Sequence, residues 1–463
     1  MFDKEIYVSR REALKKSVGS GLLLFPGNNE SSINYVDNAY YFRQDSTFLY
    51  FFGHSKPGLA AVIDVDNDEE IFYGDDLTID DVIWTGPMPT VNELAEEVGV
   101  GLSGSLSSLK NQLSKAIKSG RQVHLLPPYR PDHYIVLSGW MDVAVKEVDD
   151  YISLKFIQGV LALRSIKTDP EIAEMHLAAD ITGRMHTTAI KGARPGMIEY
   201  ELTGKITGVA MSGGGNLSFP VILTVDGQTL HNHYHGNTMK EGDLLLVDCG
   251  AENGMGYAGD MTRTIPVSGR FDQRQKEIYQ IVLSAQEHAI SMLRPGISYA
   301  EVNMLSLKTI ATGLNDLGLM KGDPEEAARL GAVALFMPHG VGHMIGLDVH
   351  DMENLGEDLV GYDASFKRSD IFGLRSLRLG KRLEAGFAVT VEPGVYFIPD
   401  LINKWKSEQK FSAFINYEQL KKYHDFGGVR IEDDYLINAE GATLLGKPVP
   451  KTIAEIEGLK QEK

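Results

Sequence analysis

Two aspartates flank a glycine-rich turn in the middle of the chain, in the segment LLLVDCGAENGMGYAGDMTRTIPV at 244–267. Asp248 follows an apolar run, and Asp260 begins a second extended run after four glycines. This pattern predicts a β-hairpin. Paired strands can place the two carboxylates across from each other, with Cβ atoms about 5 Å apart for a direct pair. Carboxylates that close repel unless a proton or a cation lies between them. The hairpin therefore indicates a metal site. A salt bridge is the alternative, but no basic residue precedes Arg263 in the hairpin.

Three later segments carry groups that suit the same chemistry. His339, His343 and His350 lie among glycines, which is not the pattern of a helix face and predicts either a ligand loop or an ordinary polar loop. Glu392 lies at the end of a strand-like segment, TVEPG. Glu432 lies in GVRIEDD, whose alternation indicates a strand with its charged residues on one face. A single acidic strand residue is usually solvated, so neither glutamate is persuasive alone.

Taken together, four carboxylates and one imidazole suit hard or borderline divalent ions such as Mn²⁺, and the lack of cysteine ligands argues against a structural zinc site. Four carboxylates offset the charge of two such ions and can hold them roughly 3.5–4 Å apart. Water between two ions loses a proton near neutral pH and becomes a nucleophile. The predicted chemistry is hydrolysis of an activated carbonyl or phosphoryl group. The candidate ligands are Asp248, Asp260, His343, Glu392 and Glu432.

The elements that must position these groups occur twice along the chain. Residues 194–196 and 294–296 both read Arg-Pro-Gly, and each triplet lies between two helical stretches. Gly242 precedes Asp248 with five residues between them, as Gly386 precedes Glu392. Two such halves packed about an approximate two-fold axis would bring the carboxylates together in the middle. Chance matching of short glycine motifs is the alternative.

The length of 463 residues predicts two domains, because one compact core rarely grows so large. Residues 1–165 mix short apolar runs at 22–25, 48–52, 60–65 and 123–126 with helical candidates at 92–98 and 106–117, which predicts a small α/β domain. Residues 166–463 form the second domain, which opens with a strong helix start at Thr168-Asp169-Pro170-Glu171. Trp84 is expected in the core, with a contact across an interface as the alternative.

Composition bounds the class of protein and its partners. A net charge of −18 argues against a nucleic-acid binder or a protein of anionic membranes, since both need a basic surface. One cysteine, Cys249, leaves no internal disulfide and suits a reducing compartment. The first residues contain no apolar signal segment, and no apolar run is long enough to span a bilayer. We therefore expect a cytoplasmic protein with no membrane and no nucleic-acid partner.

At this point a resemblance becomes specific. The motifs DCG…GYAGDMTRT, HGVGHMIGLDVHD, VEPGVY and GVRIEDD resemble the metal-binding motifs of the pita-bread metallopeptidases, above all the proline-specific aminopeptidase P and prolidase branch. The resemblance covers 166–448, and RQDSTFLYFFG at 43–53 is similar to the amino-terminal domain of aminopeptidase P. It implies an α/β amino-terminal domain plus an α+β pita-bread catalytic domain with an internal pseudo-two-fold repeat.

The resemblance also implies roles for individual residues. The five candidate ligands would bind two metal ions, usually manganese, with Asp260 and Glu432 bridging them. Glu392 would also move the proton from the attacking water to the leaving proline nitrogen. His350 would hydrogen-bond near the scissile carbonyl and stabilise the tetrahedral state. The pocket would further be lined by His339, His231, Tyr396 and Arg430.

The pocket histidine, Arg430 and the segment 352–380 each leave alternatives open. His231 is preferred to His233 as the pocket histidine because of its distance along the chain from Asp248. Arg430 shares a strand face with Glu432, so charge pairing and substrate contact are both possible roles for it. Residues 352–380 form a long insert between His350 and Glu392, and this leaves substrate contacts from that segment undecided.

The implied activity is removal of the residue before proline from peptides with proline at the second position. Aminopeptidase P is favoured over prolidase by the amino-terminal resemblance and by the ending VPKTIAEIE. Methionine aminopeptidase is disfavoured because that branch usually lacks so large an amino-terminal domain. A creatinase-like hydrolase and a non-catalytic binding protein are disfavoured because all five ligand positions are filled. The resemblance suggests a homodimer or homotetramer, with Trp84 as a candidate contact.

Overall fold

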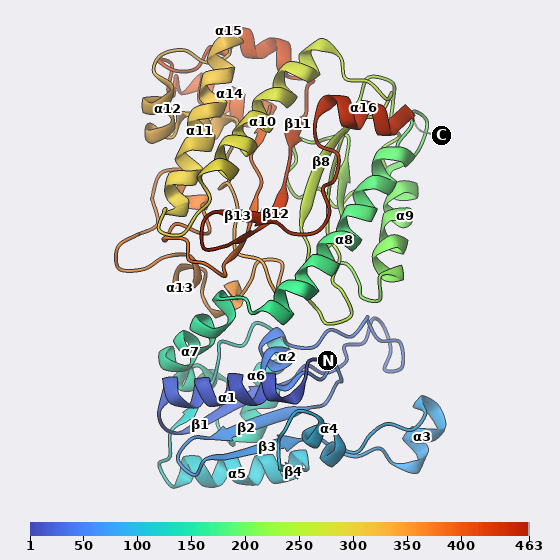
Figure 1. Cartoon of the computed structure of the whole chain (residues 1–463), viewed down its shortest axis with the longest axis vertical. Helices are drawn as coiled ribbons and strands as arrows, with labels where there is room; N and C mark the ends of the chain where they lie inside the picture. Colours follow the sequence, from blue (N-terminus) through green and yellow to red (C-terminus); the bar gives the residue numbers. More distant parts are fainter. Residues whose placement is uncertain (462–463) are drawn as a thin grey trace. The chain divides into compact units, whose positions relative to one another are not determined.

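The computed structural model describes residues 1–461 and divides the chain into two compact units. The first unit comprises Met1–Ser165 together with Met352–Gly356, and the second comprises Ile166–Asp351 and the chain from Glu357 onward (Figure 1). No helix within residues 1–461 combines the length and the apolar character needed to cross a membrane.

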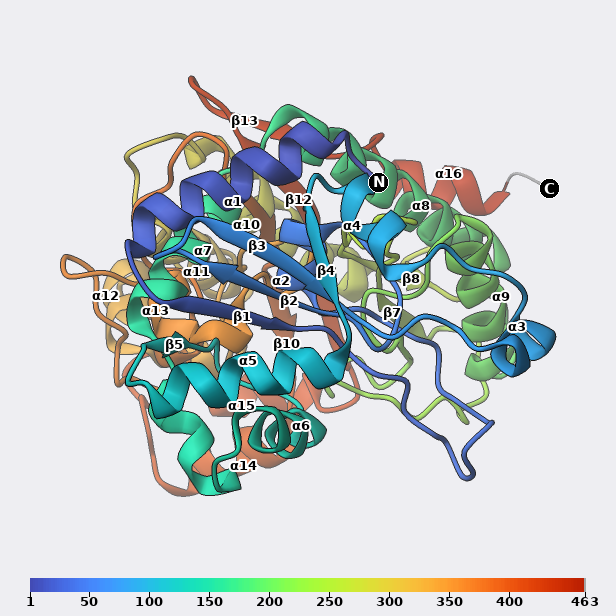
Figure 2. The ribbon, with the colours of Figure 1, turned by 90° about the horizontal axis from the view of Figure 1, so that it is seen from below.

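The first unit is built on a five-stranded sheet in the order β4-β3-β2-β1-β5. Strand β1 is antiparallel to β2 and parallel to β5, and Figure 2 shows the strands side by side with α1 along one side and α5 along the other. Its elements are α1 (Lys4–Val18), β1 (Leu22–Pro26), α2 (Ser46–Phe52), β2 (Ala60–Asp64), β3 (Glu69–Tyr73), α3 (Ile79–Thr85), α4 (Val91–Glu97), β4 (Leu102–Gly104), α5 (Leu106–Lys118), β5 (Val123–His124), α6 (Pro131–Met141), η1 (Val145–Tyr151) and α7 (Leu154–Ser165).

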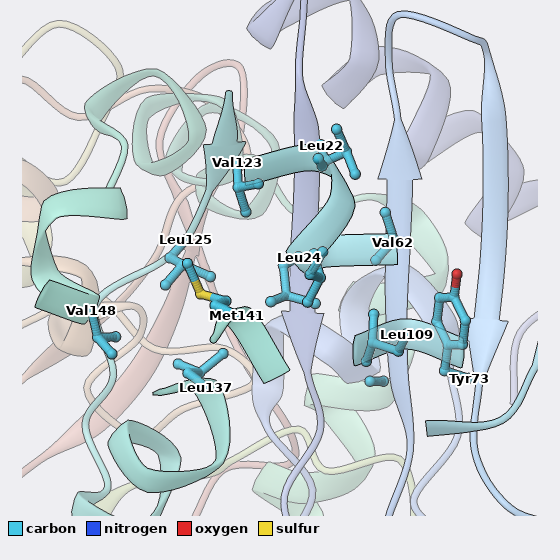
Figure 3. Packing of buried hydrophobic residues seen from close by; sticks show 13 residues of the cluster. Leu22, Leu24, Val62, Tyr73, Leu109, Val123, Leu125, Leu137, Met141 and Val148 are labelled. Atoms are coloured by element: carbon cyan, nitrogen blue, oxygen red, sulfur yellow. The ribbon is translucent and has the colours of Figure 1, made fainter. Parts of the chain in front are cut away.

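The period-two alternation of β1 divides the core of this unit between the two faces of the sheet. Leu22 and Leu24 pack with residues of α5 and α6 in one buried cluster (Figure 3). Phe25 packs against aromatic rings of α2 and α7, with ring centroids 5.1–5.3 Å apart. Helices α4 and α5 lie where the sequence predicts them. In each helix a Thr or Ser side chain caps the first turn, and the buried residues are regularly spaced apolar ones.

The structure settles two features of this unit. The apolar run 48–52, to which the sequence analysis assigned no element, is most of helix α2, whose seven residues are all buried. The carboxylate of Asp45 accepts the N–H of Phe48 at 2.7 Å, and Gly53 ends the helix at φ 70°. A short run that is apolar on every side has no period that distinguishes a helix from a strand. Trp84, on α3, is not a core residue, because 87% of its surface is exposed.

The second unit contains two three-stranded sheets, β6-β7-β8 and β13-β12-β9, and the pair β10-β11. In Figure 1 the helix pairs α8/α9 and α10/α11 lie on either side of these strands. The elements that carry or flank the strands are α8 (Asp169–Gly192), α9 (Glu199–Ser212), β6 (Ile222–Thr224), β7 (Leu244–Cys249), β8 (Met261–Pro266), α10 (Gln273–Met292), α11 (Tyr299–Asp316), β9 (Ala388–Val391), β10 (Gly394–Tyr396), β11 (Gly428–Arg430), β12 (Asp433–Ile437) and β13 (Ala442–Leu444). The remaining elements are α12 (Pro324–Leu330), η2 (Ala332–Leu335), α13 (Glu357–Gly361), η4 (Leu374–Ser376), α14 (Pro399–Ser407), α15 (Tyr417–Leu420), η5 (Lys421–Tyr423) and α16 (Ile453–Gln461), while η3 (Glu353–Leu355) belongs to the first unit.

The internal repeat is confirmed at the level of single hydrogen bonds. Gly196, in the first Arg-Pro-Gly triplet, donates its N–H to Met239 O at 2.8 Å, and Gly296 in the second triplet donates to Leu383 O at 2.8 Å. Each acceptor lies three positions before the glycine that opens a carboxylate-bearing strand segment. Both of those glycines, Gly242 and Gly386, have positive φ angles of 87° and 95°. The two halves therefore repeat the same helix–turn–helix–strand connection.

Candidate metal centre

The β7–β8 hairpin forms as expected, but its register differs from a direct pairing of the two aspartates. Asp248 lies opposite Thr262, and Asp260 lies one position before the strand that begins at Met261. The two aspartates are therefore diagonal neighbours on one strand face. Continuing the register places Gly250 opposite Asp260, and a Cβ added at Gly250 would lie 1.8 Å from Gly259 O. The glycines thus allow a close approach of the two chains directly beside the carboxylates.

Three of the candidate ligands meet at one point. Asp260, His343 and Glu432 each offer a ligand atom, and these atoms lie within 4.8 Å of one another. His343 Nε2 is 3.5 Å from Asp260 Oδ2 and 3.9 Å from Glu392 Oε1. Its Nδ1 lies 3.0 Å from Met344 O, so an Nδ1–H donates there and Nε2 is the atom that faces the carboxylates. The first and the last of these three residues, Asp260 and Glu432, are 172 positions apart in the sequence.

The histidine loop is held against β9 by backbone hydrogen bonds. Thr390 donates its N–H to His343 O at 3.0 Å, and Glu392 donates to Val341 O at 2.8 Å. A Cβ at Gly342 would lie 2.2 Å from Thr390 O, so only glycine permits this approach. The glycines among the histidines therefore position His343 beside Glu392.

A chain of hydrogen bonds links Asp248 to His339 through Arg430 and Tyr396. Arg430 pairs through Nη2 with Asp248 Oδ2, and it donates from Nη1 to the Tyr396 hydroxyl at 2.8 Å and from Nε to Thr262 Oγ1 at 3.1 Å. The Tyr396 hydroxyl is also 2.9 Å from His339 Nε2. Arg430 is therefore engaged in charge pairing, although its partner is Asp248 and not the neighbouring Glu432. We expected Tyr396 to line the cavity. It is instead fully buried and is not among the lining residues.

The cluster opens into a cavity of about 320 Å³. His231 and His233 both line it, together with His350, whose ring stacks on His343 with centroids 3.9 Å apart. Part of its lining is apolar and comes from Phe219, Pro220, Ile222, Leu230 and Val349. All five candidate ligands and His339 line the same cavity. The structure thus brings the charged groups and a shaped apolar surface to one place.

Burial and mutual repulsion perturb the acidic groups. Burial, with the charge of Asp260, raises the pKa of Asp248 to about 6 and the pKa of Glu392 to about 7, against the opposing effect of Arg430. The pKa of Glu432 is raised well above its ordinary value by the same two causes. Burial lowers the pKa of His343, but Asp260 and Glu392 outweigh it and raise this pKa to about 9. Burial and Arg430 lower the pKa of His339 to about 3, so His339 is neutral.

These residues fit a site for divalent cations. Among the described residues, the buried oxygens Asp248 Oδ1 and Asp260 Oδ1 have no hydrogen-bond partner. Buried carboxylate oxygens without partners are costly unless a cation neutralises them. The oxygen-rich donor set with one imidazole suits two divalent ions.

Metal binding is expected to release protons and to strengthen as pH rises. In the metal-free protein Asp248 and Glu392 carry raised pKa values, so at pH 6–7 they hold protons that the unfolded chain has already lost. The stability of the metal-free protein should therefore fall as pH rises from about pH 4 to about pH 7, and the raised pKa of His343 continues the fall to about pH 9. Calorimetry in buffers of different ionisation enthalpy measures the released protons. A pH-independent affinity for Mn²⁺ would contradict this expectation.

Three polar residues at the site were not identified from the sequence. Thr262 donates its hydroxyl to Glu432 Oε2 at 2.7 Å, and Asp434 Oδ2 accepts the N–H of Asp260 at 2.9 Å. Strand alternation could have found them, because Thr262 shares a face with Asp260, and Asp434 shares a face with Glu432. Arg378, inside the 352–380 insert, lines the cavity and pairs with Glu357 at 3.1 Å. No local pattern singles out this arginine.

Comparison with known proteins agrees with this geometry. A family model described as metallopeptidase family M24 matches residues 173–439, and a model of the aminopeptidase P N-terminal domain matches residues 7–125. The Xaa-Pro aminopeptidase of Escherichia coli (strain K12) is 33% identical over 473 residues, covering 98% of this chain and 97% of that protein. The human Xaa-Pro dipeptidase is 29% identical over 450 residues, covering 94% of this chain and 88% of that protein.

Solved structures show the same likeness over nearly the whole chain. A zinc-substituted aminopeptidase P from E. coli in complex with product superposes with a TM-score of 0.81 at 30% identity, covering 99% of this chain and 98% of that one. The aminopeptidase PepP of Pseudomonas aeruginosa superposes with the same TM-score at 27% identity and the same coverage. The chain belongs to metallopeptidase family M24. The expected two-part fold and the expectation of a metallopeptidase are thereby confirmed.

Proposed function

We propose that this protein is a metal-dependent Xaa-Pro aminopeptidase, which releases the amino-terminal residue of peptides that carry proline at the second position. The observation that carries the proposal is the convergence of Asp248, Asp260, His343, Glu392 and Glu432 on one cavity with an apolar wall. The match to an aminopeptidase P N-terminal domain at residues 7–125 favours the aminopeptidase over other activities on this fold.

The same five side chains would hold two divalent ions, with Asp260 and Glu432 as the carboxylates proposed to be shared by both. When bound, such ions would ease deprotonation of a water molecule near neutral pH and would polarise the scissile carbonyl. We infer Mn²⁺ from the donor set, because carboxylate oxygens outnumber nitrogen and no thiolate contributes.

Glu392 is the proposed proton carrier of the reaction. Its two oxygens face different histidines, with Oε1 3.9 Å from His343 Nε2 and Oε2 3.8 Å from His339 Nδ1. In the metal-free protein, burial is the main cause that raises the pKa of this carboxyl to about 7. Glu392 accepts the proton of the attacking water and returns it to the proline nitrogen as the amide bond breaks.

The remaining polar groups hold the substrate and the ligands. His350 lines the cavity beside His343 and donates a hydrogen bond to the developing oxyanion. Arg430 keeps Asp248 in place through their ion pair. The proline ring offers no N–H and has a fixed φ, so it needs a shaped wall more than a polar partner. The apolar side chains together with His231 and His339 supply that wall.

The test is release of free amino acid from an Xaa-Pro dipeptide and from an Xaa-Pro-Yaa tripeptide by protein stripped of metal and reloaded with Mn²⁺. Cleavage of the tripeptide and of longer peptides is the expected result. Cleavage of the dipeptide alone would instead identify a prolidase. If neither peptide is cleaved, the proposal is wrong, and a creatinase-like or non-catalytic role on the same fold takes its place.

One observation favours the dipeptidase as a second candidate. Arg378 lines the cavity, and a guanidinium at that position can bind the free carboxylate of a dipeptide. In that case Arg378→Met should raise KM for the dipeptide by about 10–100-fold, the cost of a charge-assisted hydrogen bond, and leave the tripeptide nearly unchanged. Arg375→Met, an exposed arginine of the same segment, is the matched control. Equal KM changes for both peptides would count against a carboxylate-binding role.

We further propose a homodimer or homotetramer. Helix α3 buries none of its seven residues, and Ile79, Ile83 and Trp84 are 75%, 70% and 87% exposed. A helix this short gains little stability without packing, which favours a partner surface. Ile83→Glu should shift the sedimentation coefficient toward the monomer, whereas Ile135→Glu, at a 68% exposed position on α6, should not. A wild-type protein that sediments as a monomer would refute the proposal.

A cytoplasmic location and the absence of nucleic-acid partners complete the proposal. The net charge of −18 and the single buried cysteine support both parts of it. Fractionation of cells that express the tagged protein tests the location. Recovery in a membrane or secreted fraction would contradict it.

A further inference from the structure

Beside Asp260 and Glu432, the two neighbouring backbone segments have a second polar layer that faces away from the cavity. Thr262 points its hydroxyl toward Glu432, while the next residue, Arg263, points away from the cavity. Likewise Glu432 lines the cavity and the next residue, Asp433, does not. Arg263 and Asp433 meet on that reverse face, where Nη2 donates to Oδ1 at 2.6 Å. The mechanism proposed above uses neither residue.

Arg263 uses its guanidinium to join three segments. Nη1 donates to Thr262 O at 2.9 Å and to Glu432 O at 2.7 Å, which ties together the backbones of the two metal-facing strands. Nη2 and Nε also donate to carbonyls of the carboxy-terminal segment, at Val449 O and Pro450 O. The side chain is fully buried and makes five hydrogen bonds, the full number a guanidinium can donate.

A further shell holds this ion pair from behind. Asp433 Oδ2 accepts hydrogen bonds from Lys451 Nζ at 2.9 Å and from Gln286 Nε2 at 3.1 Å. Lys451 Nζ also donates to Gln286 Oε1 at 3.0 Å, and Lys451 O accepts the hydroxyl of Tyr279 at 2.7 Å. These contacts fasten the ending VPKTIAEIE to helix α10 and to the strand of Glu432.

A buried ion pair usually adds little net stability, because desolvation offsets much of the attraction. The hydrogen bonds of this ion pair matter here because they fix the distance between two backbone segments. The carbonyls of Thr262 and Glu432 share one rigid donor group, and Glu432 also donates its N–H to Thr262 O at 3.1 Å. The separation between Glu432 and the strand that follows Asp260 is therefore set from the reverse face.

We propose that Arg263, supported by Asp433 and Lys451, is a positioning residue that fixes the separation of Asp260 and Glu432 and so sets the affinity of the site for its ions. This inference rests on the proposed metal site. It assigns the carboxy-terminal segment 449–451 a part in the site, although that segment contributes no residue to the cavity lining.

Arg263→Lys is the first test, because it keeps the charge and offers three donors in place of five. Loss of an outer partner of a metal ligand typically costs about 10–100-fold in metal affinity. Calorimetric titration of the stripped protein with Mn²⁺ should show that loss in Kd. At saturating Mn²⁺ the KM for an Xaa-Pro-Yaa tripeptide should stay within about twofold of wild type, since Arg263 touches none of the cavity wall.

Lys451→Met keeps the inference testable if Arg263→Lys does not fold. The Lys451 side chain is 24% exposed, and its removal leaves Asp433 with Arg263 and Gln286. A loss of about tenfold in Mn²⁺ affinity is expected, at the lower end of the range for outer partners. Lys447→Met, with a side chain 89% exposed, is the matched control and should bind Mn²⁺ like wild type.

The outcomes separate this inference from the proposed function. Wild-type metal affinity in folded Arg263→Lys and Lys451→Met overturns the inference alone, provided wild type binds Mn²⁺ and cleaves Xaa-Pro peptides. A parallel loss of metal affinity and peptide affinity also overturns it, because it indicates a general structural role. A wild-type protein that binds no Mn²⁺ and cleaves no peptide overturns the proposed function and this inference with it.

Discussion

Asp260→Ala is expected to abolish peptidase activity and metal loading while the chain stays folded. Asp260 lies at the meeting point with His343 and Glu432, and its Oδ1 is buried without a partner in the described part of the chain. Loss of this carboxylate removes a proposed bridge between the ions. Because loss of an outer partner alone costs up to about 100-fold in metal affinity, loss of a ligand should cost at least that much. Metal analysis and a peptide assay measure the two losses.

The fold of this variant has a clear expectation of its own. The charge of Asp260 raises the pKa values of Asp248, Glu392 and Glu432, so its removal relieves repulsion in the metal-free protein. The metal-free variant should therefore unfold at a temperature no lower than that of metal-free wild type. The exposed Asp316→Ala is the control and should keep both metal and activity. Full activity in Asp260→Ala would refute the site assignment.

His350→Ala is expected to lower kcat by about 10²–10³-fold, the range measured when one donor to a developing oxyanion is removed. His350 lines the cavity and stacks on the proposed ligand His343, yet it is not part of the cluster of Asp260, His343 and Glu432. Metal content should therefore fall much less than turnover. Turnover of an Xaa-Pro-Yaa peptide and metal content are measured on the same preparation.

The exposed His424→Ala is the matched control for general effects of losing an imidazole. It should leave both quantities at the wild-type level. If His350→Ala loses metal and turnover to the same extent, His350 is a ligand or a structural support for His343 and does not stabilise the transition state.

Local patterns predicted the elements whose chemistry is local. The β7–β8 hairpin follows from an apolar run, a glycine turn and a second extended run. The two halves of the second unit follow from paired Arg-Pro-Gly triplets and from glycines at 242 and 386, which both have positive φ angles. A turn with a positive φ angle can be predicted from the glycine in the sequence, because few other residues adopt a positive φ at low cost. The residue types of the candidate site were also predictable, because the chemistry of a carboxylate or an imidazole is a property of the side chain itself.

Contacts between distant segments were not readable in this way. The sequence placed Arg430 on a face with Glu432, but the fold pairs it with Asp248, 182 positions away. Residues 48–52 of helix α2 are apolar on all sides, so they show no helical periodicity in the sequence. Trp84 is exposed because α3 packs none of its residues into the core. The residue types of that segment do not predict this exposure.

The candidate donor set, the repetition of the elements that carry it and the chemistry of such a set all follow from the order of residues along the chain. The diagonal placement of Asp248 and Asp260, the presence of Arg378 in the cavity lining and the Arg263–Asp433–Lys451 layer depend on how the chain packs in three dimensions. The physical reason is that register, burial and ion pairing depend on which strands meet. That choice is made by the packing of the whole core and not by any segment alone.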